Sequence, residues 1–306
     1  MAASFRAAWS LLRETFDEWS KDKAPRLGAA LAYYTSLSLA PLLLVVIGIA
    51  GLVFGAEAAR GQIVGQLEGL VGEQGARAIQ DMVANASTPS SGIIATVVGI
   101  VTLLLGASGV FGQLQDALNT VWEVEPKPGR GIWGLIKDRF LSLTMVFGTG
   151  FLLLVSLVIT AAVSAAGGTL RGLGPGLEAI AHVVVEIVSF AVVTLLFALI
   201  YKFLPDAKIA WRDVWVGAVA TAVLFVIGKF AIGLYLGHAS IGSAYGAAGS
   251  FVVVLVWTYY SAQILLFGAE LTQVYANRSG SHVEPARDAV KITPEKRAEE
   301  GMPRSA

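Results

Sequence analysis

Residues 214–237, "VWVGAVATAVLFVIGKFAIGLYLG", are almost entirely apolar and contain one charged side chain, Lys229. A stretch of about 20 apolar residues is long enough to cross the hydrocarbon core of a bilayer as a helix. The apolar residues run continuously rather than alternating with a period of two, which favours a helix over a strand of a membrane barrel. The stretch therefore predicts a membrane-spanning helix with a lysine inside it.

The rest of the chain has the composition of a multi-pass membrane protein. Of its 306 residues, 55% are hydrophobic and 14% are charged, whereas about 25% are charged in an ordinary soluble domain. Six segments are long and apolar enough to span a bilayer: 28–54, 92–112, 140–166, 180–203, 214–237 and 247–275. The predicted fold is an all-α membrane protein in which residues 25–276 form a six-transmembrane-helix bundle.

The distribution of Lys and Arg predicts the orientation of this bundle. Eighteen of the 22 basic residues fall in the N-terminal segment, the loops that follow spans two and four, and the tail. The opposite loops hold only Arg60, Arg77 and Arg171. Because the cytoplasmic loops of membrane proteins are enriched in Lys and Arg, we expect both termini in the cytoplasm.

The N-terminal segment, residues 1–24, has an amphipathic pattern that is too polar to span. Its aromatic and aliphatic residues recur on one helical face: Phe5, Trp9, Leu12, Phe16 and Trp19. This pattern predicts either an interfacial amphipathic helix, with its aromatic side chains among the lipid headgroups, or a cap that packs against the bundle.

Two further segments lie outside the spans. Residues 55–91 form the longest outer loop, where two short helices are expected to cover the outer ends of the spans or to form a lid over a cavity. Residues 277–306 are polar, with mixed charge and three prolines. That composition predicts a disordered cytoplasmic tail.

Lys229 has candidate partners on the preceding span. Glu186 lies roughly 9 Å and Lys229 roughly 12 Å below the outer surface if each residue rises about 1.5 Å, and His182 lies one turn from Glu186. Because an isolated charge in the bilayer costs about 2.5–3.5 kcal/mol, the acid and the base can pair across the two helices, or they can face water in a cavity. The three residues form a candidate outer substrate-binding cluster. The alternatives are a buried pair that sets helix packing and a lysine that extends to the interface.

A second group of polar residues lies toward the cytoplasmic side. It comprises Tyr33 and Tyr34 in span one, Asp116 after span two, and Gln263 and Glu270 in span six. These residues form a candidate inner substrate-binding cluster that lines a vestibule. The alternative is hydrogen bonding between helices, which membrane bundles use routinely.

The outer turn before span six is rich in glycine. Its sequence, "GSAYGAAGS" (242–250), contains Tyr245 and Gly246. A flexible turn of this kind is expected to break the start of the helix and to act as a gate.

Several classes of function find no support in the sequence. The chain has no cysteine and three histidines, so disulfides, thiolate metal sites and cysteine nucleophiles are excluded and no metal site is predicted. No P-loop, HExxH or GxSxG motif is present, and we expect neither an enzyme nor a cofactor. The net charge is zero, which gives no indication of nucleic-acid binding.

Four motifs, taken in order, resemble the YihY/BrkB family of bacterial inner-membrane proteins. They are "DKAPRLGAALAYYTSLSLAPLLL" (22–44), "GASGVFGQLQDALNTVWEV" (106–124), "YKFLPDAKIAWRDVWVGAVATAVLF" (201–225) and "AYGAAGSFVVVLVWTYYSAQILLFGAELTQVYA" (244–276). The resemblance covers about residues 20–278. It implies six spans with cytoplasmic termini in the inner membrane, and motif positions at Tyr33, Tyr34, Asp116, Lys229, Tyr245 and Glu270.

The same resemblance bears on function. Members have been labelled as a ribonuclease, but this chain has no nuclease metal set, so we do not expect that activity. Other members have been linked to envelope integrity, serum resistance and lipid export. The two polar clusters lead us to expect a transporter or flippase-like handler of a lipid or amphiphilic solute, with membrane lipids as partners. The alternative is a non-transporting envelope scaffold; oligomeric state and energy source stay open.

Overall fold

The computed structural model describes residues 2–54, 61, 76–77, 79–80, 109–129, 175–238 and 249–303. Several predictions fall outside these residues. They concern the span over 140–166, most of the span over 92–112, most of the outer loop over 55–91, and the turn that contains Tyr245 and Gly246.

The described chain is mostly helical. Its long helices are α1 (Ala2–Lys21), α2 (Ala24–Phe54), α6 (Pro175–Phe203), α7 (Trp211–His238) and α9 (Gly249–Ser279), and residues 109–121 are also helical. Within the described residues, three stretches are long and apolar enough to cross a membrane: Val183–Phe203, Trp211–Ile232 and Phe251–Ser279. They coincide with the last three predicted spans. α2 covers the first, and the count of six stays a prediction.

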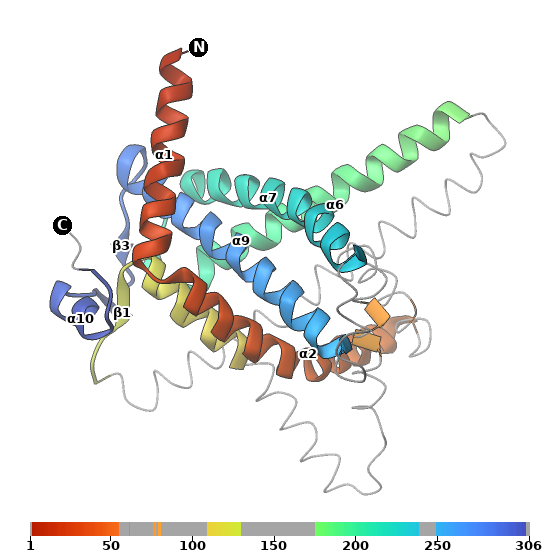
Figure 1. Cartoon of the computed structure of the whole chain (residues 1–306), viewed down its shortest axis with the longest axis horizontal. Helices are drawn as coiled ribbons and strands as arrows, with labels where there is room; N and C mark the ends of the chain where they lie inside the picture. The colour runs from red at the N-terminus through yellow and green to blue at the C-terminus, as the bar shows by residue number, and fades with distance from the viewer. Residues whose placement is uncertain are drawn as a thin grey trace, which may run out of the picture.

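Helix α9 lies at the centre of the described bundle, where it packs against α1, α2 and α7, while α6 packs against α7 (Figure 1). The contact between α7 and α9 depends on two glycines. A Cβ at Gly217 would lie 1.6 Å from Oγ1 of Thr272, and a Cβ at Gly268 would lie 1.8 Å from Oγ1 of Thr221. A threonine of each helix thus packs against a glycine of the other, and the missing side chain at each glycine allows α7 and α9 to approach closely.

A buried tyrosine joins α6 to both of these helices. The hydroxyl of Tyr201 donates a hydrogen bond to the carbonyl of Leu265 at 2.8 Å and lies 3.0 Å from the hydroxyl of Thr221. Tyr201 is fully buried. Its hydroxyl is therefore satisfied inside the bundle, as a buried polar group must be.

The helix over residues 109–121 is fixed to the loop between α6 and α7. The side chain of Asn119 accepts a hydrogen bond from the backbone N–H of Asp206 at 2.7 Å and donates one to its carboxylate at 3.1 Å. The amide of Gln115 donates to the same carboxylate at 3.4 Å. These bonds connect two of the sequence motifs across 87 positions of the chain.

The C-terminal residues are folded, so the prediction of a disordered tail is wrong for residues 277–303. β3 (Glu284–Pro285) pairs with β2 (Ala207–Lys208), and β4 (Ala289–Lys291) pairs with β1 (Val124–Pro126). Helix α10 (Pro294–Glu299) follows, with Thr293 as its N-cap. The tail is ordered because loops far away in the sequence supply its strand partners, and its own polar composition does not reveal them.

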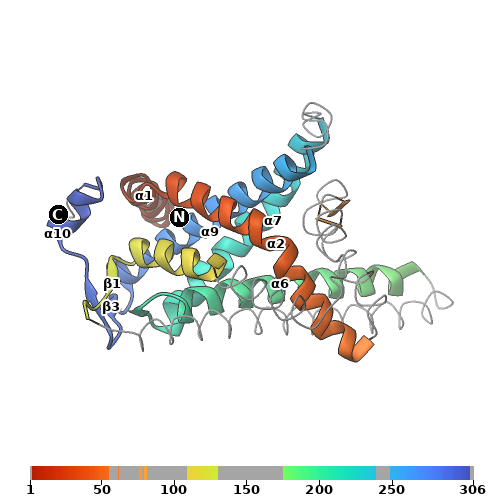
Figure 2. The ribbon, with the colours of Figure 1, turned by 90° about the horizontal axis from the view of Figure 1, so that it is seen from below.

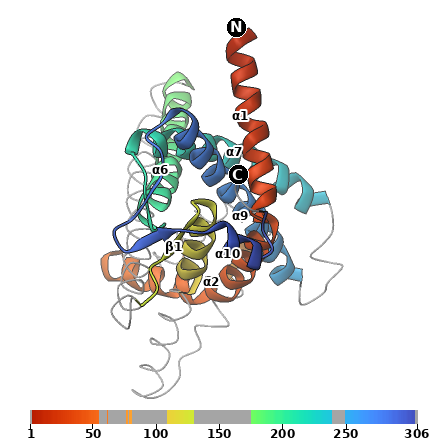
Figure 3. The same ribbon diagram turned by 90° about the vertical axis from the view of Figure 1, so that its left-hand side faces the viewer.

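Four segments that the charge pattern places on one side of the membrane meet at one end of the molecule. They are the end of α1, the residues around β1, the loop that contains β2, and the tail with α10 (Figure 3). This common location agrees with the charge distribution. The assignment of this end to the cytoplasm stays a prediction.

Helix α1 lies across the bundle rather than along it. Figure 2 views α1 almost end-on, while α2, α6 and α9 run across the picture. Thr15 is fully buried, and α1 packs against α9, but Trp9 is 64% exposed and Phe16 is 56% exposed. The helix therefore packs on the bundle and also presents an apolar surface. Its position in a membrane interface stays a prediction.

Candidate functional site

The described side chains of the candidate outer cluster, Glu186 and Lys229, do not form an ion pair with each other. Glu186 is exposed on α6. The Lys229 ammonium instead lies 5.6 Å from the centroid of the Phe230 ring. His182 belongs to α6, but its side chain lies outside the described part of the structure. A substrate-binding role for these three residues stays a prediction.

The candidate inner cluster divides into two parts. Tyr33 and Tyr34 are 56% and 44% exposed on α2, with their rings in edge contact, and Asp116 is exposed on the helix over 109–121. Gln263 and Glu270 instead lie on α9 and face the interior, where Glu270 is only 1% exposed. Of the five residues of this cluster, only Gln263 and Glu270 therefore lie together in the interior of the bundle.

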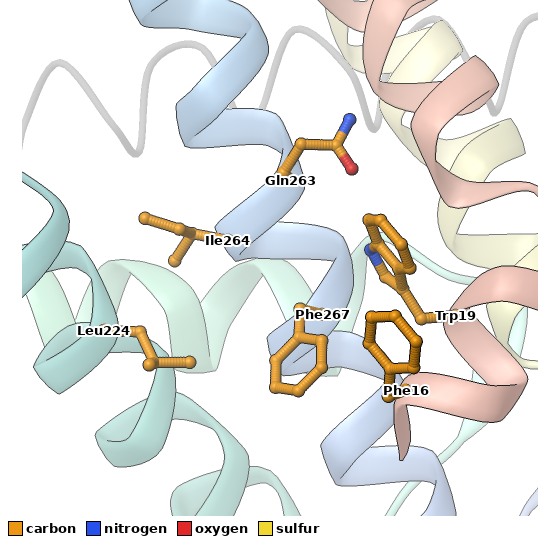
Figure 4. A pocket seen from close by; sticks show the side chains of 6 residues that line it. All are labelled: Phe16, Trp19, Leu224, Gln263, Ile264 and Phe267. Atoms are coloured by element: carbon orange, nitrogen blue, oxygen red, sulfur yellow. The ribbon is translucent and has the colours of Figure 1, made fainter. Parts of the chain in front are cut away.

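A groove opens between α1, α7 and α9. It is lined by Phe16 and Trp19 from α1, Leu224 from α7, and Gln263, Ile264 and Phe267 from α9 (Figure 4). Its volume is about 240 Å³, and it is open on one side rather than enclosed. Gln263 is the one lining residue with an amide side chain, and the other five are aromatic or aliphatic. We refer to it as the α1/α7/α9 groove, and its surface suits a hydrocarbon group.

The polar atoms in the wall of the groove have unmet hydrogen bonds. Both amide atoms of Gln263 and Nε1 of Trp19 are buried and have no hydrogen-bond partner among the described residues. Gln263 fits beside α2 only because residue 28 is glycine, since a Cβ there would lie 2.0 Å from its Nε2. Unsatisfied buried polar groups cost about 1–3 kcal/mol each, and these three atoms are buried behind the apolar surface of the groove.

Glu270 lies two helical turns from Gln263 on the same face of α9, about 10 Å along the axis. Its Oε1 is buried and has no hydrogen-bond partner in the described structure. Four charged groups outside α9 act on it electrostatically: Glu18, Asp22, Glu123 and Arg297. Glu270 therefore stands between the groove and a group of charged side chains at the end of the bundle.

That group of charged side chains is centred on a buried arginine. Arg297 is 1% exposed; its Nη2 lies 2.5 Å from Oδ1 of Asp22, and its Nη1 lies 3.1 Å from Oε1 of Glu123. Its Nε donates to the carbonyl of Pro303 at 3.2 Å. We call Asp22, Glu123 and Arg297 the arginine cluster. It joins the N-terminal segment, the turn before β1 and the tail.

Two carboxylates share one guanidinium in the arginine cluster. The pKa of Asp22 is raised to about 6. Burial is the largest cause, the charge and the hydrogen bond of Arg297 oppose it, and the nearby carboxylates of Glu123 and Glu18 add to it. A carboxyl group with this pKa can gain or lose a proton near neutral pH.

Sequence reasoning did not find the arginine cluster or the role of α1 in the groove. Arg297 stands in a polar segment that has the composition of a solvated tail. One local signal was present: Thr293 followed by Pro294 has the pattern of an N-cap with proline at the first helical position, which predicts the start of α10.

The family model and the curated relatives that match this chain point to the same family of membrane proteins. A family model described as "Virulence factor BrkB" matches residues 15–293. A UPF0761 membrane protein of Psychrobacter sp. (strain PRwf-1) is 27% identical over 287 residues, covering 93% of this chain and 52% of that protein. One from Pseudomonas aeruginosa (strain LESB58) is 30% identical over 286 residues, covering 89% and 63%.

The chain spans between about half and two thirds of the length of these curated relatives. No solved structure matches the chain.

Proposed function

The chain belongs to the BrkB family of membrane proteins, and from that premise we propose that it binds and moves a lipid or an amphiphilic solute as a transporter or flippase-like protein. In this proposal the protein has six spans, lies in a bacterial inner membrane and has both termini in the cytoplasm, as its charge distribution indicates. No enzymatic reaction and no cofactor are assigned to it. Membrane lipids are its expected partners.

The observation that carries the proposal is the α1/α7/α9 groove. Aromatic and aliphatic side chains from three helices line it, and two of these helices are long and apolar enough to span a membrane. In this proposal the groove opens to the hydrocarbon of the bilayer. Its volume of about 240 Å³ lies just below the range of whole-ligand pockets. It therefore suits part of one acyl chain rather than a complete lipid.

The apolar surface of the groove favours a hydrocarbon chain. Burial of each methylene of a chain contributes about 0.8 kcal/mol, and it needs no polar partner. The unpartnered amide of Gln263 and the indole N–H of Trp19 are buried behind this surface. In this proposal the groove therefore holds part of an acyl chain, and the polar group of the lipid lies outside it.

The test is movement of a fluorescent phospholipid across the bilayer of proteoliposomes that contain the purified protein. Leu224→Trp places an indole in the groove and is expected to lower the rate at least severalfold. Val223→Trp, on the neighbouring exposed position of α7, adds the same side chain outside the groove and is expected to leave the rate unchanged. A rate in wild-type vesicles equal to that in empty vesicles would refute the proposed movement of this lipid.

A second candidate function rests on a different observation. The folded end built from β1–β4 and α10 offers a surface that a partner protein can bind, and this suits a non-transporting envelope scaffold. The two functions differ in what they require. A scaffold keeps its effect on the cell envelope in the Leu224→Trp variant, whereas a lipid-moving protein loses it.

A further inference from the structure

Glu270 is a buried acid that the proposed groove does not by itself explain. It sits on α9 with 1% of its surface exposed, and its Oε1 has no hydrogen-bond partner among the described residues. A negative charge removed from water without a counter-ion is strongly disfavoured. The neutral, protonated carboxyl is therefore the form of Glu270 that fits this structure.

Most of the charged groups that act on Glu270 in the described structure are acids. The charged groups that act on it are Glu18 from α1, Asp22 from the turn after α1, Glu123 from the turn before β1, and Arg297 from α10. Three of the four are acids. Arg297 is already paired with Asp22 and Glu123. These two acids largely neutralise its positive charge, so it is a poor counter-ion for Glu270.

Two features, one on α9 and one on α1, connect Glu270 to the groove. Gln263, in the wall of the groove, lies two turns away on the same face of α9. Helix α1 packs against α9 and supplies both Phe16 and Trp19 to the groove and Glu18 to the surroundings of Glu270. A displacement of α1 from α9 would therefore admit water to Glu270 and remove one wall of the groove.

We propose that Glu270 is a proton-binding site that controls the α1/α7/α9 groove. The Glu270 carboxylate takes one proton from water and becomes a neutral carboxylic acid, which allows α1 to pack on α9 and completes the groove. Release of the proton to water leaves a carboxylate beside three other acids, and α1 moves away from α9. This inference rests on the proposed lipid-binding function and names the ion to which it is linked.

The protonation of Glu270 is tested by infrared spectroscopy of the full chain in lipid nanodiscs. We expect the wild-type protein at neutral pH to show the C=O stretch of a protonated carboxyl that is absent from Glu270→Gln and present in Glu295→Gln, a control on the exposed surface of α10. Identical carboxyl bands in wild-type and Glu270→Gln protein would overturn the assignment. If Glu270→Gln does not fold, Glu270→Asp keeps a carboxyl group and is expected to shift the band.

The link to the groove is tested by binding of a phosphatidylcholine with a pyrene-labelled acyl chain, between about pH 5 and about pH 8. The wild-type affinity is expected to fall as the pH rises, by at most about tenfold per pH unit, the limit for one linked proton. Glu270→Gln is expected to keep the acid-side affinity at every pH. The same pH dependence in Glu270→Gln, or its loss in Asp22→Asn instead, would overturn the proposal.

The two proposals fail in different ways. Lipid binding that does not depend on pH in the wild-type protein would refute the proton link and leave the lipid-binding function standing. An absence of lipid binding at every pH would refute that function, and the infrared measurement would still decide whether Glu270 holds a proton.

Discussion

Arg297 of α10 forms an ion pair with Asp22, 275 positions earlier in the chain, with 2.5 Å between Nη2 and Oδ1 and both side chains almost fully buried. The pair joins the folded tail to the end of α1, and Glu123 joins the same guanidinium. Because Asp22 and Glu123 share the one guanidinium of Arg297, removal of Arg297 and removal of Asp22 are expected to change the stability of the protein in different ways.

Removal of Arg297 is expected to destabilise the protein strongly. Arg297→Met leaves Asp22 buried without its counter-ion, and a broken buried pair of this kind costs about 3–5 kcal/mol. Thermal unfolding in detergent measures the loss, and limited proteolysis of the tail locates it. Lys296→Met is the matched control, because the Lys296 side chain is 46% exposed where it pairs with Glu125 and pairs near the surface contribute about 0–1 kcal/mol. Equal effects of the two substitutions would contradict the central role of Arg297.

Asp22 gives the tail a predicted pH dependence. Burial raises its pKa from 3.8 to about 6, so the folded state binds the proton more tightly than the unfolded state does. The stability that this preference contributes is fully present below about pH 4 and is lost as the pH rises through about 6, by up to about 3 kcal/mol.

Asp22→Asn is neutral at every pH and is expected to lack this loss. Above about pH 6 it is expected to be more stable than the wild-type protein, in contrast to Arg297→Met. Free energies of unfolding of both proteins from pH 4 to pH 7 provide the measurement. A wild-type protein that gains stability relative to Asp22→Asn as the pH rises would show that the pKa of Asp22 is lowered rather than raised.

The contact between α7 and α9 is expected to tolerate no side chain at Gly217. Gly217→Ala places a methyl group against Thr272, and overpacking of this kind costs about 1–3 kcal/mol. A Cβ at Gly112 meets nothing within 4 Å among the described residues, so Gly112→Ala is expected to be neutral or stabilising through its higher helix propensity. A melting temperature that Gly217→Ala leaves unchanged would rule out the close approach.

Glu186 and Lys229 are expected to act independently. No ion pair joins them in the described structure, so a double-mutant cycle of Glu186→Gln and Lys229→Met is expected to give an interaction energy within about 0.5 kcal/mol of zero. Unfolding in detergent provides the four free energies. A coupling well above about 1 kcal/mol would instead support the pair that the sequence allows.

The elements that sequence predicts well are those set by local composition. The apolar length of residues 180–203, 214–237 and 247–275 is a local property, and α6, α7 and α9 are found there. Gln263 and Glu270, which the sequence analysis places in one polar cluster, both have buried side-chain atoms in the structure. Tyr33 and Tyr34 are exposed instead, because composition alone does not fix how a helix is rotated about its axis.

The features that sequence does not predict depend on contacts between distant segments. The tail is ordered by strands that begin at Val124 and Ala207, and Arg297 is buried by Asp22 and Glu123. Neither a hydropathy pattern nor a charge count contains these pairings. The groove likewise needs α1 to lie across α9, which the amphipathic pattern of α1 leaves open.

The most direct test of the central claim is to map where an acyl chain contacts the protein. A phospholipid with a photoactivatable group in its acyl chain is cross-linked to the full chain in nanodiscs, and the modified residues are identified by mass spectrometry. We predict enrichment at the groove residues, Phe16, Trp19, Leu224, Ile264 and Phe267, and loss of that enrichment in Leu224→Trp. Equal labelling of the exposed positions Ile227, Phe230 and Leu234 of α7, unchanged by Leu224→Trp, would contradict a lipid site in the α1/α7/α9 groove.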